Sequence, residues 1–266
     1  MFPYRLIATD LDGTLLRSDD TVSERTRAAL ASATGAGAAH IIVTGRPVPW
    51  TRDILADLGY RGIAVCGQGS QVYDAGADRL LTALTLDRRV AALALAKIEA
   101  ETGPLALAAS RSGTTGSVLV GPGYAVHEGP GPYAPLTSRD ELWAEPLNKI
   151  YLQCPGLSDD ELTEIARHTA GDLVGVTMAG AGMVELLPLG LTKARGLSLA
   201  ARRLGSGPSD TLAFGDMPND IPMLDWAAHG VAMANAHEEL KAVADEETAS
   251  NDEDGVALTV EAMLRG

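Results

Sequence analysis

The sequence opens on a short apolar segment that runs into two aspartates, Leu6-Ile7-Ala8-Thr9-Asp10-Leu11-Asp12-Gly13-Thr14-Leu15-Leu16. Residues 6–9 are typical of a buried strand, and Gly13 permits a turn after it. Residues two apart in extended chain project to the same side, so Asp10 and Asp12 are expected together at the carboxyl edge of a sheet, where open α/β folds bind ligands. Two carboxylates this close repel each other. Their ionisation near neutral pH favours a bound cation, and an all-oxygen site suits Mg²⁺.

Two other interpretations of this segment are weaker. An aspartate-rich calcium loop needs a glycine where Leu15 stands and a glutamate where Thr21 stands. A pair of solvated turn aspartates accounts equally well for the four residues 10–13 alone. The strand before them and the apolar residues after them argue against it.

The composition is that of a globular protein with a strong excess of negative charge. Of the 266 residues, 46% are hydrophobic, and 35 acidic against 21 basic side chains give a formal net charge of −14. Such a charge repels phosphate backbones and anionic membranes, so we expect no nucleic-acid partner and no membrane partner. A protein of this charge that handles phosphate must neutralise its site locally, with a metal and a few placed donors.

Cysteine usage and hydropathy favour a cytoplasmic location. Cys66 and Cys154 lie outside any metal-ligand spacing and are typical of core residues in a reducing compartment. The apolar run at the N-terminus is too short for a signal peptide, and no later run is long enough to span a bilayer.

Strand and helix patterns alternate at both ends of the chain, which indicates a parallel sheet with helices on both faces. Strands are expected at 6–9, 40–43, 62–66, 211–214 and 230–233, and helices at 23–34, after Pro47, at 192–204 and at 221–228. The charge-rich run 245–254 is expected to be a solvated turn between two helices.

The pattern changes near Thr82 and changes back after Pro188. In between, helices are expected at 87–102 and 158–169, strands at 105–109, 117–120, 148–154, 173–178 and 183–187, and a Gly/Pro-rich stretch at 121–135. The fold class is therefore expected to be α/β with an inserted α+β module. The domains are placed at 1–82 and 189–266 for the core and at 83–188 for the insertion.

Thr44-Gly45-Arg46 follows the second expected strand and precedes Pro47, which fits the first turn of a helix. The hydroxyl and the backbone N–H groups of this turn are candidates to hold phosphate oxygens. Ordinary capping of the helix by Thr44 explains the motif equally well on its own.

Lys193 stands at the expected start of a helix, in Gly190-Leu191-Thr192-Lys193-Ala194. A cation there opposes the helix dipole at a cost of roughly 0.3 to 1 kcal/mol, which a nearby anion would offset. Taken alone, a solvent-exposed lysine is the better interpretation.

A further acidic motif, Gly215-Asp216-Met217-Pro218-Asn219-Asp220, follows the strand expected at 211–214. Asp216 is placed to share a metal with Asp10. For Asp220, metal contact and capping of the following helix fit equally well. Together the four strand ends supply a carboxylate pair, a hydroxyl, an ammonium and another carboxylate.

On these motifs the chain resembles the haloacid dehalogenase superfamily and, within it, the Cof-type hydrolases with a class IIB cap. The resemblance extends to Val231-Ala-Met-Ala-Asn-Ala236 and Ser250-Asn-Asp-Glu-Asp-Gly255 and covers almost the whole chain. It implies a Rossmann-like core, a mobile inserted cap that determines specificity, and hydrolysis of a phosphate monoester, most often of a sugar phosphate.

The resemblance also implies residue roles. Asp10 would attack phosphorus to form an aspartyl phosphate, and Asp12 would protonate the leaving oxygen and then activate water. Thr44 and Lys193 would hold the phosphoryl oxygens, and Asn219 would orient the phosphate or Lys193. Mg²⁺ would be bound by Asp10, the Asp12 carbonyl and Asp216, with Asp220 contributing through water. The Gly45 and Arg46 turn completes the candidate phosphate site.

Other features leave the substrate and the assembly open. Many relatives carry Asn-Gly-Ala where this chain has Gln68-Gly69-Ser70, so specificity cannot be transferred. Surface or core packing is the preferred interpretation for individual residues that could line the substrate space: Arg46, Trp50, Arg111, Lys149 and Glu185. The alternatives to a phosphatase are a phosphomutase and a non-catalytic module that binds phosphorylated metabolites. A monomer or homodimer is expected.

Overall fold

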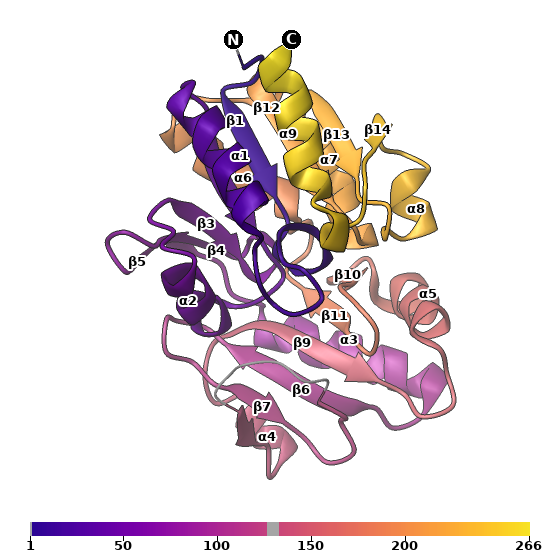
Figure 1. Cartoon of the computed structure of the whole chain (residues 1–266). Coiled ribbons are helices and arrows are strands. Elements are labelled where there is room, and N and C mark those ends of the chain that lie inside the picture. Colours follow the sequence, from indigo (N-terminus) through magenta and orange to yellow (C-terminus); the bar gives the residue numbers. More distant parts are fainter. Residues whose placement is uncertain (1, 127–132) are drawn as a thin grey trace.

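β1 (Leu6–Thr9) lies inside the larger of two sheets in the computed structural model, which describes residues 2–126 and 133–266. All four of its residues are buried, and it pairs in parallel with β12 on one side and β2 on the other. Within the described part of the chain, this core sheet has the order β14-β13-β12-β1-β2-β3-β4-β5 (Figure 1). The carboxyl ends of β1, β2 and β12 therefore meet at one edge. The strands are β2 (Ala39–Val43), β3 (Ile63–Cys66), β4 (Gln71–Asp74), β5 (Arg79–Ala83), β12 (Thr211–Gly215), β13 (His229–Ala232) and β14 (Glu246–Glu247).

Helices cover both faces of the core sheet, as the alternating pattern predicts. α1 (Glu24–Gly35) contacts α9 (Gly255–Arg265), and α6 (Lys193–Arg203) contacts α7 (Ile221–Trp226). α1 begins at a Ser23 cap that accepts from the Thr26 N–H, and the Thr192 cap of α6 accepts from the Arg195 N–H. The remaining core helices are α2 (Val48–Asp57) and α8 (Glu238–Lys241). The core is α/β with a Rossmann-like arrangement.

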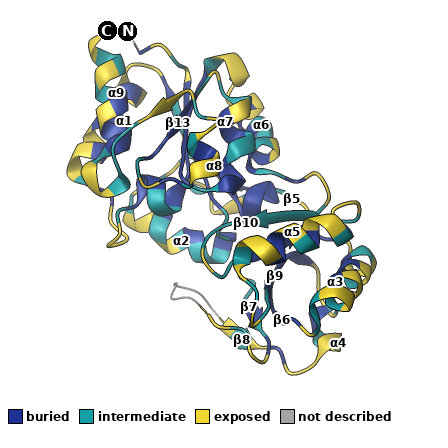
Figure 2. Ribbon diagram, turned by 90° about the vertical axis from the view of Figure 1, so that its right-hand side faces the viewer, coloured by how far each residue is buried: buried dark blue, intermediate teal, exposed yellow. Residues whose placement is uncertain are grey.

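The inserted segment builds a second sheet with the order β10-β11-β9-β6-β7-β8 (Figure 1). Alternate strand residues pack against its helices in one apolar cluster, including Leu107, Ile150 and Leu186. The outer faces of α3 and α5 are exposed, whereas β6 and β9 beneath them are buried (Figure 2). The elements are α3 (Arg88–Thr102), β6 (Ala106–Arg111), β7 (Val118–Val120), β8 (Tyr133–Pro135), α4 (Arg139–Leu142), β9 (Leu147–Gln153), α5 (Asp159–Ala170), β10 (Gly175–Met178) and β11 (Val184–Leu187).

Two expectations about the core sheet are wrong toward its two ends. β4 and β5 run antiparallel, so the core sheet is not purely parallel. The charge-rich run is not only a turn, because Glu246–Glu247 pairs in parallel with β13. Both residues are exposed and give no hydrophobic alternation.

Other elements differ mainly in their ends. β10 begins at Gly175 rather than 173, and α7 ends at Trp226 rather than 228. The Gly/Pro-rich stretch contributes β8, while residues 127–132 lie outside the described residues. Among the described helices, none has the length and apolar character needed to cross a membrane.

Candidate active site

Asp10 follows β1 directly, and its backbone N–H donates to the Phe214 carbonyl of β12 at 3.0 Å. Its carboxylate is nearly buried, and its Oδ1 accepts from the Lys193 ammonium at 2.6 Å. Lys193 is the first residue of α6, and it also donates to Asp220 Oδ1 at 2.7 Å. Lys193 is 2% exposed, so the interpretation of a solvent-exposed lysine is wrong.

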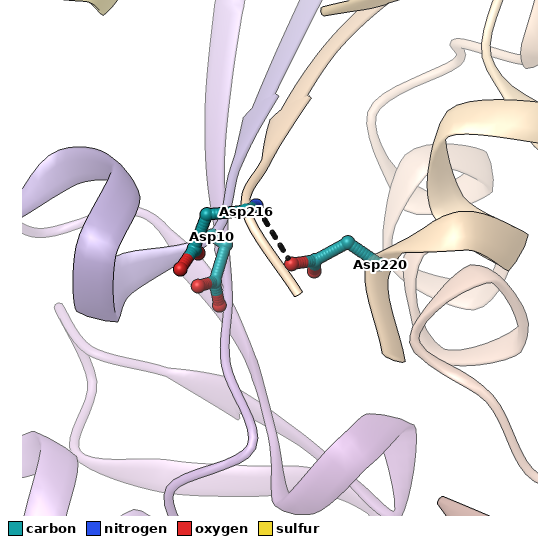
Figure 3. A group of neighbouring side chains, drawn as sticks. All are labelled: Asp10, Asp216 and Asp220. Atoms are coloured by element: carbon teal, nitrogen blue, oxygen red, sulfur yellow. Dashed lines mark hydrogen bonds between the residues drawn. The ribbon is translucent and has the colours of Figure 1, made fainter. Parts of the chain in front are cut away.

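Three buried carboxylates meet at this edge of the sheet: Asp10, Asp216 and Asp220 (Figure 3). One oxygen from each lies within 4.8 Å of the others. Asp220 Oδ2 accepts from the backbone N–H groups of Asp216 at 3.2 Å and of Met217 at 3.1 Å, which closes the turn between them. The Asp220 side chain makes no capping hydrogen bond to α7. Of the two interpretations of Asp220, its position among the site carboxylates is the one that the geometry favours.

Burial and mutual repulsion act on these carboxylates. Burial raises the pKa of Asp10 well above its ordinary value; Lys193 opposes this shift, and Asp220 and Asp216 add to it. The pKa of Asp216 is raised to about 7, mainly by burial and then by Asp220. Burial alone would lower the pKa of Lys193, but Asp10 and Asp220 raise it. Three carboxylates and one ammonium leave two negative charges when all are ionised.

This donor set fits Mg²⁺, which takes carboxylate oxygens and would neutralise the two remaining charges. The surroundings agree. Thr14 Oγ1 donates to Asp216 Oδ1 at 3.0 Å and orients it, and the Asn219 amide oxygen is buried with no hydrogen-bond partner among the described residues. Gly13, at φ +72°, comes so close that an added Cβ would lie 2.3 Å from Asp216 Oδ2. Asp10, Asp216 and Asp220 are therefore the residues that would hold the ion.

Asp12 lies outside this carboxylate cluster. Its side chain is 46% exposed, and both of its oxygens accept from Arg46, with Arg46 Nε at 2.9 Å from Oδ2. Arg46 was expected to bind phosphate, and in this structure its guanidinium instead holds the carboxylate expected to act as acid and base. Metal binding by the Asp12 carbonyl stays a prediction.

Thr44 and Gly45 occupy the turn after β2. The Thr44 hydroxyl accepts from the Arg46 N–H at 3.0 Å, and Pro47, not Thr44, stands at the cap position of α2. Capping by Thr44 is therefore wrong, and phosphate binding by its hydroxyl stays a prediction. The Gly45 carbonyl accepts from Lys149 Nζ of the second sheet at 2.7 Å.

A cavity of about 380 Å³ opens over the carboxylates and is closed on its far side by the second sheet. The sequence-predicted residues that line it are Asp10, Asp12, Gly45, Arg46, Lys193, Asp216 and Asn219. It is also lined by Trp50, Lys149 and Glu185, for which packing alone was the preferred interpretation, whereas Arg111 is not among its lining residues.

A buried hydrogen-bond chain joins the second sheet to two turns of the core beside this cavity, and sequence reasoning did not find it. Lys149 pairs with Glu185, whose Oε2 accepts from Gln68 Nε2 at 2.8 Å. Gln68 Oε1 in turn accepts from Asn219 Nδ2 at 3.0 Å. The available signal was a lysine and a glutamate inside otherwise apolar strands, since such charges are rarely buried unless they are paired.

Comparison with known proteins identifies the family to which the chain belongs. The family model for haloacid dehalogenase-like hydrolases matches residues 7–260. The chain belongs to this family and is a phosphatase enzyme of the haloacid dehalogenase type.

Two curated relatives and one solved structure match most of this chain. The HMP-PP phosphatase of Serratia proteamaculans is 30% identical over 244 residues, which cover 90% of this chain and 87% of that protein. The chloroplastic endoribonuclease YBEY of Arabidopsis thaliana is 32% identical, and the match covers 96% of this chain but only 45% of that protein. The structure of a subclass IIB sugar phosphatase shares the fold with a TM-score of 0.77 at 22% identity, over 97% of this chain and 98% of the other. The Cof-type assignment is confirmed.

Proposed function

We propose that the chain is a Mg²⁺-dependent phosphomonoester hydrolase that works through an aspartyl phosphate on Asp10. The observation that carries this proposal is the buried Asp10 carboxylate, held 2.6 Å from Lys193 beside Asp216 and Asp220. A carboxylate whose charge is offset by an ammonium, at the bottom of a cavity, is placed to act as a nucleophile.

The reaction has two steps. Asp10 attacks phosphorus, the bond from phosphorus to the ester oxygen breaks, and Asp12 donates a proton to that leaving oxygen. Asp12 then takes a proton from a water molecule whose oxygen attacks phosphorus, and the bond from phosphorus to Asp10 breaks. Lys193 and the Thr44 turn hold the phosphoryl oxygens, and bound Mg²⁺ would supply positive charge to them.

Within this proposal, residues 1–82 and 189–266 form the catalytic core and 83–188 form the cap. The substrate is a small phosphorylated metabolite, as the name of the HMP-PP phosphatase suggests for that relative, and sugar phosphates are the class expected from the family resemblance. The net charge of −14 argues against polyanionic partners, and we propose a cytoplasmic enzyme that is a monomer or homodimer.

Replacing the nucleophile tests the mechanism. Asp10→Asn keeps the shape of the side chain but removes the attacking charge, so release of phosphate from p-nitrophenyl phosphate with Mg²⁺ should fall by about 10³-fold or more. Asp19→Asn, in an exposed turn, is the matched control and should retain full activity. Retention of most of the activity in Asp10→Asn, with an unchanged circular dichroism spectrum, would overturn the mechanism.

A further inference from the structure

The cap sheet presents two different faces. Strand pairing aligns Glu185 with Tyr151, Tyr151 with Ala108, and Ala108 with Val120, so these four form one row across the sheet. Their neighbours Leu152, Leu107 and Leu119 point the other way and pack under α3 and α5. Ala108, Val118 and Tyr151 instead cluster with Trp50 of the core helix α2. This second face is therefore the one that closes the cavity over Asp10.

The charged part of this face is already paired. Lys149 binds Glu185, donates to the Gly45 carbonyl and lies 4.7 Å from the centre of the Tyr151 ring. The other Glu185 oxygen accepts from Gln68. Both side chains are at most 2% exposed. Their hydrogen-bonding capacity is engaged between cap and core, so little of it is left for a leaving group.

The rest of the cap side is apolar and aromatic. Trp50 and Tyr133 form an edge-on pair with ring centres 5.3 Å apart, and Tyr124 and Tyr151 form a tilted pair at 6.4 Å. Among the described residues, the other apolar side chains of this lining are Ala108, Val118, Val120, Val126, Ala179 and Met183. Only 4% of the whole chain is aromatic, so four aromatic residues around one cavity are a local concentration.

We propose that the substrate is a phosphate monoester whose alcohol carries a planar aromatic ring, carbocyclic or heterocyclic, which sits on this surface. The proposal rests on the hydrolase function given above, and it replaces the sugar phosphates expected from the family resemblance with a different substrate class. Hydroxyls of a bare sugar would lose water against Val118, Val120 and the aromatic faces and would gain few partners there, such as the Trp50 Nε1–H that is unpaired among the described residues, which is unfavourable. A flat ring gains both apolar burial and ring-to-ring contacts there.

The test compares three esters of primary alcohols: benzyl phosphate, cyclohexylmethyl phosphate and glucose 6-phosphate. The first two differ in aromaticity and match in size. Binding to the Asp10→Asn protein with Mg²⁺ is measured by calorimetry, and phosphate release by the wild-type protein is measured in parallel. We expect benzyl phosphate to bind about threefold to tenfold more tightly than cyclohexylmethyl phosphate, and glucose 6-phosphate to bind most weakly.

Variants test whether Trp50 is responsible for the preference for benzyl phosphate. In the Asp10→Asn background, Trp50→Leu should bring the ratio of the first two dissociation constants close to one, while Trp50→Phe should keep it above one because a ring remains. Trp226→Leu, which replaces a tryptophan that does not line the cavity, should leave the ratio unchanged. Trp50 is partly buried and is not part of the apolar cluster under α3 and α5, so its replacement should leave that cluster intact.

The outcomes separate this proposal from the proposed function. Equal binding of the two ring esters, tighter binding of glucose 6-phosphate, or no binding of any ester overturns the aromatic substrate, whether or not phosphate is released. A binding preference for benzyl phosphate without phosphate release by the wild-type protein supports the substrate class and overturns the hydrolase.

Discussion

The two sides of the cavity are built in different ways. The core side concentrates charge: Lys193, the first residue of α6, lies between Asp10 and Asp220, which follow the parallel strands β1 and β12. The cap side is a sheet face made of single residues at alternate positions, mostly apolar, with one buried ion pair, Lys149–Glu185. Under the function proposed above, this difference separates the chemistry, which would depend on a few fixed contacts, from the choice of leaving group, which would depend on a surface.

Removal of the metal should have the largest effect on turnover. This effect should depend on residues of the core side alone. Chelation should abolish turnover, because Lys193 offsets only part of the repulsion among Asp10, Asp216 and Asp220 and two negative charges remain without the ion. Mg²⁺ at a hundredfold excess over its dissociation constant should raise the melting temperature by about 5 °C or more. Asp216→Asn should weaken that rise and Trp50→Leu should not. Full turnover in chelator would remove the metal from the mechanism.

The second-largest loss of turnover is expected for Lys193→Met. It removes the only positive side chain within hydrogen-bonding distance of the Asp10 carboxylate among the described residues, so kcat/KM should fall by about 10²- to 10³-fold. Lys97→Met, at a half-exposed lysine near Asp172, is the control and should change little. Similar losses in the two variants would mean that the buried ammonium has no special role.

Lys149→Met probes the cap side. It leaves the buried Glu185 carboxylate without its cation, which should destabilise the protein by about 3 to 5 kcal/mol but lower kcat/KM by only about tenfold. Adding Glu185→Gln should restore much of the lost stability, as measured by urea unfolding. A turnover loss as large as that of Lys193→Met would break the division between the two sides.

His40 lies on β2 outside both sides of the cavity and should affect stability alone. Burial lowers its pKa to about 4, so between pH 6.5 and 4 the unfolded chain binds a proton that the folded chain does not. The contribution of His40 to the free energy of unfolding is complete above pH 6.5. As the pH falls toward 4, this free energy decreases by about 3 kcal/mol at most. His40→Gln should flatten the dependence of unfolding free energy on pH in this window and leave turnover at pH 7.5 unchanged. An unaltered profile would show that His40 does not titrate in this way.

The sequence allowed prediction of the core because its signals are local. β1, β12 and α6 are apolar runs or capped helices, and the residues that follow the strands stand in short motifs, so Asp10, Lys193 and Asp216 could be placed together from their positions along the chain. The β4–β5 hairpin was not predicted from the sequence, because both strands carry polar residues and β5 lies at the edge of the sheet.

The cap side could not be predicted in the same way. Lys149 and Glu185 meet only through the pairing of β9 with β11, and Gln68 reaches them only because the cap rests on the core. Such contacts depend on the register of paired strands and on how the cap packs against the core. Because the segments involved are distant in sequence, the spacing of residues along the chain does not predict these contacts.

The separate sheets have an evolutionary consequence. Within the described residues no strand is shared between them, and hydrogen bonds across the junction are few, such as Gln71 Nε2 to the Gly113 carbonyl at 3.1 Å. If the cap surface selects the substrate as proposed, a mutation at Val118 or Val120 is expected to change what the enzyme accepts without moving Asp10. Descendants of such a protein can acquire new substrates one point mutation at a time, while selection on the catalytic loops remains undisturbed.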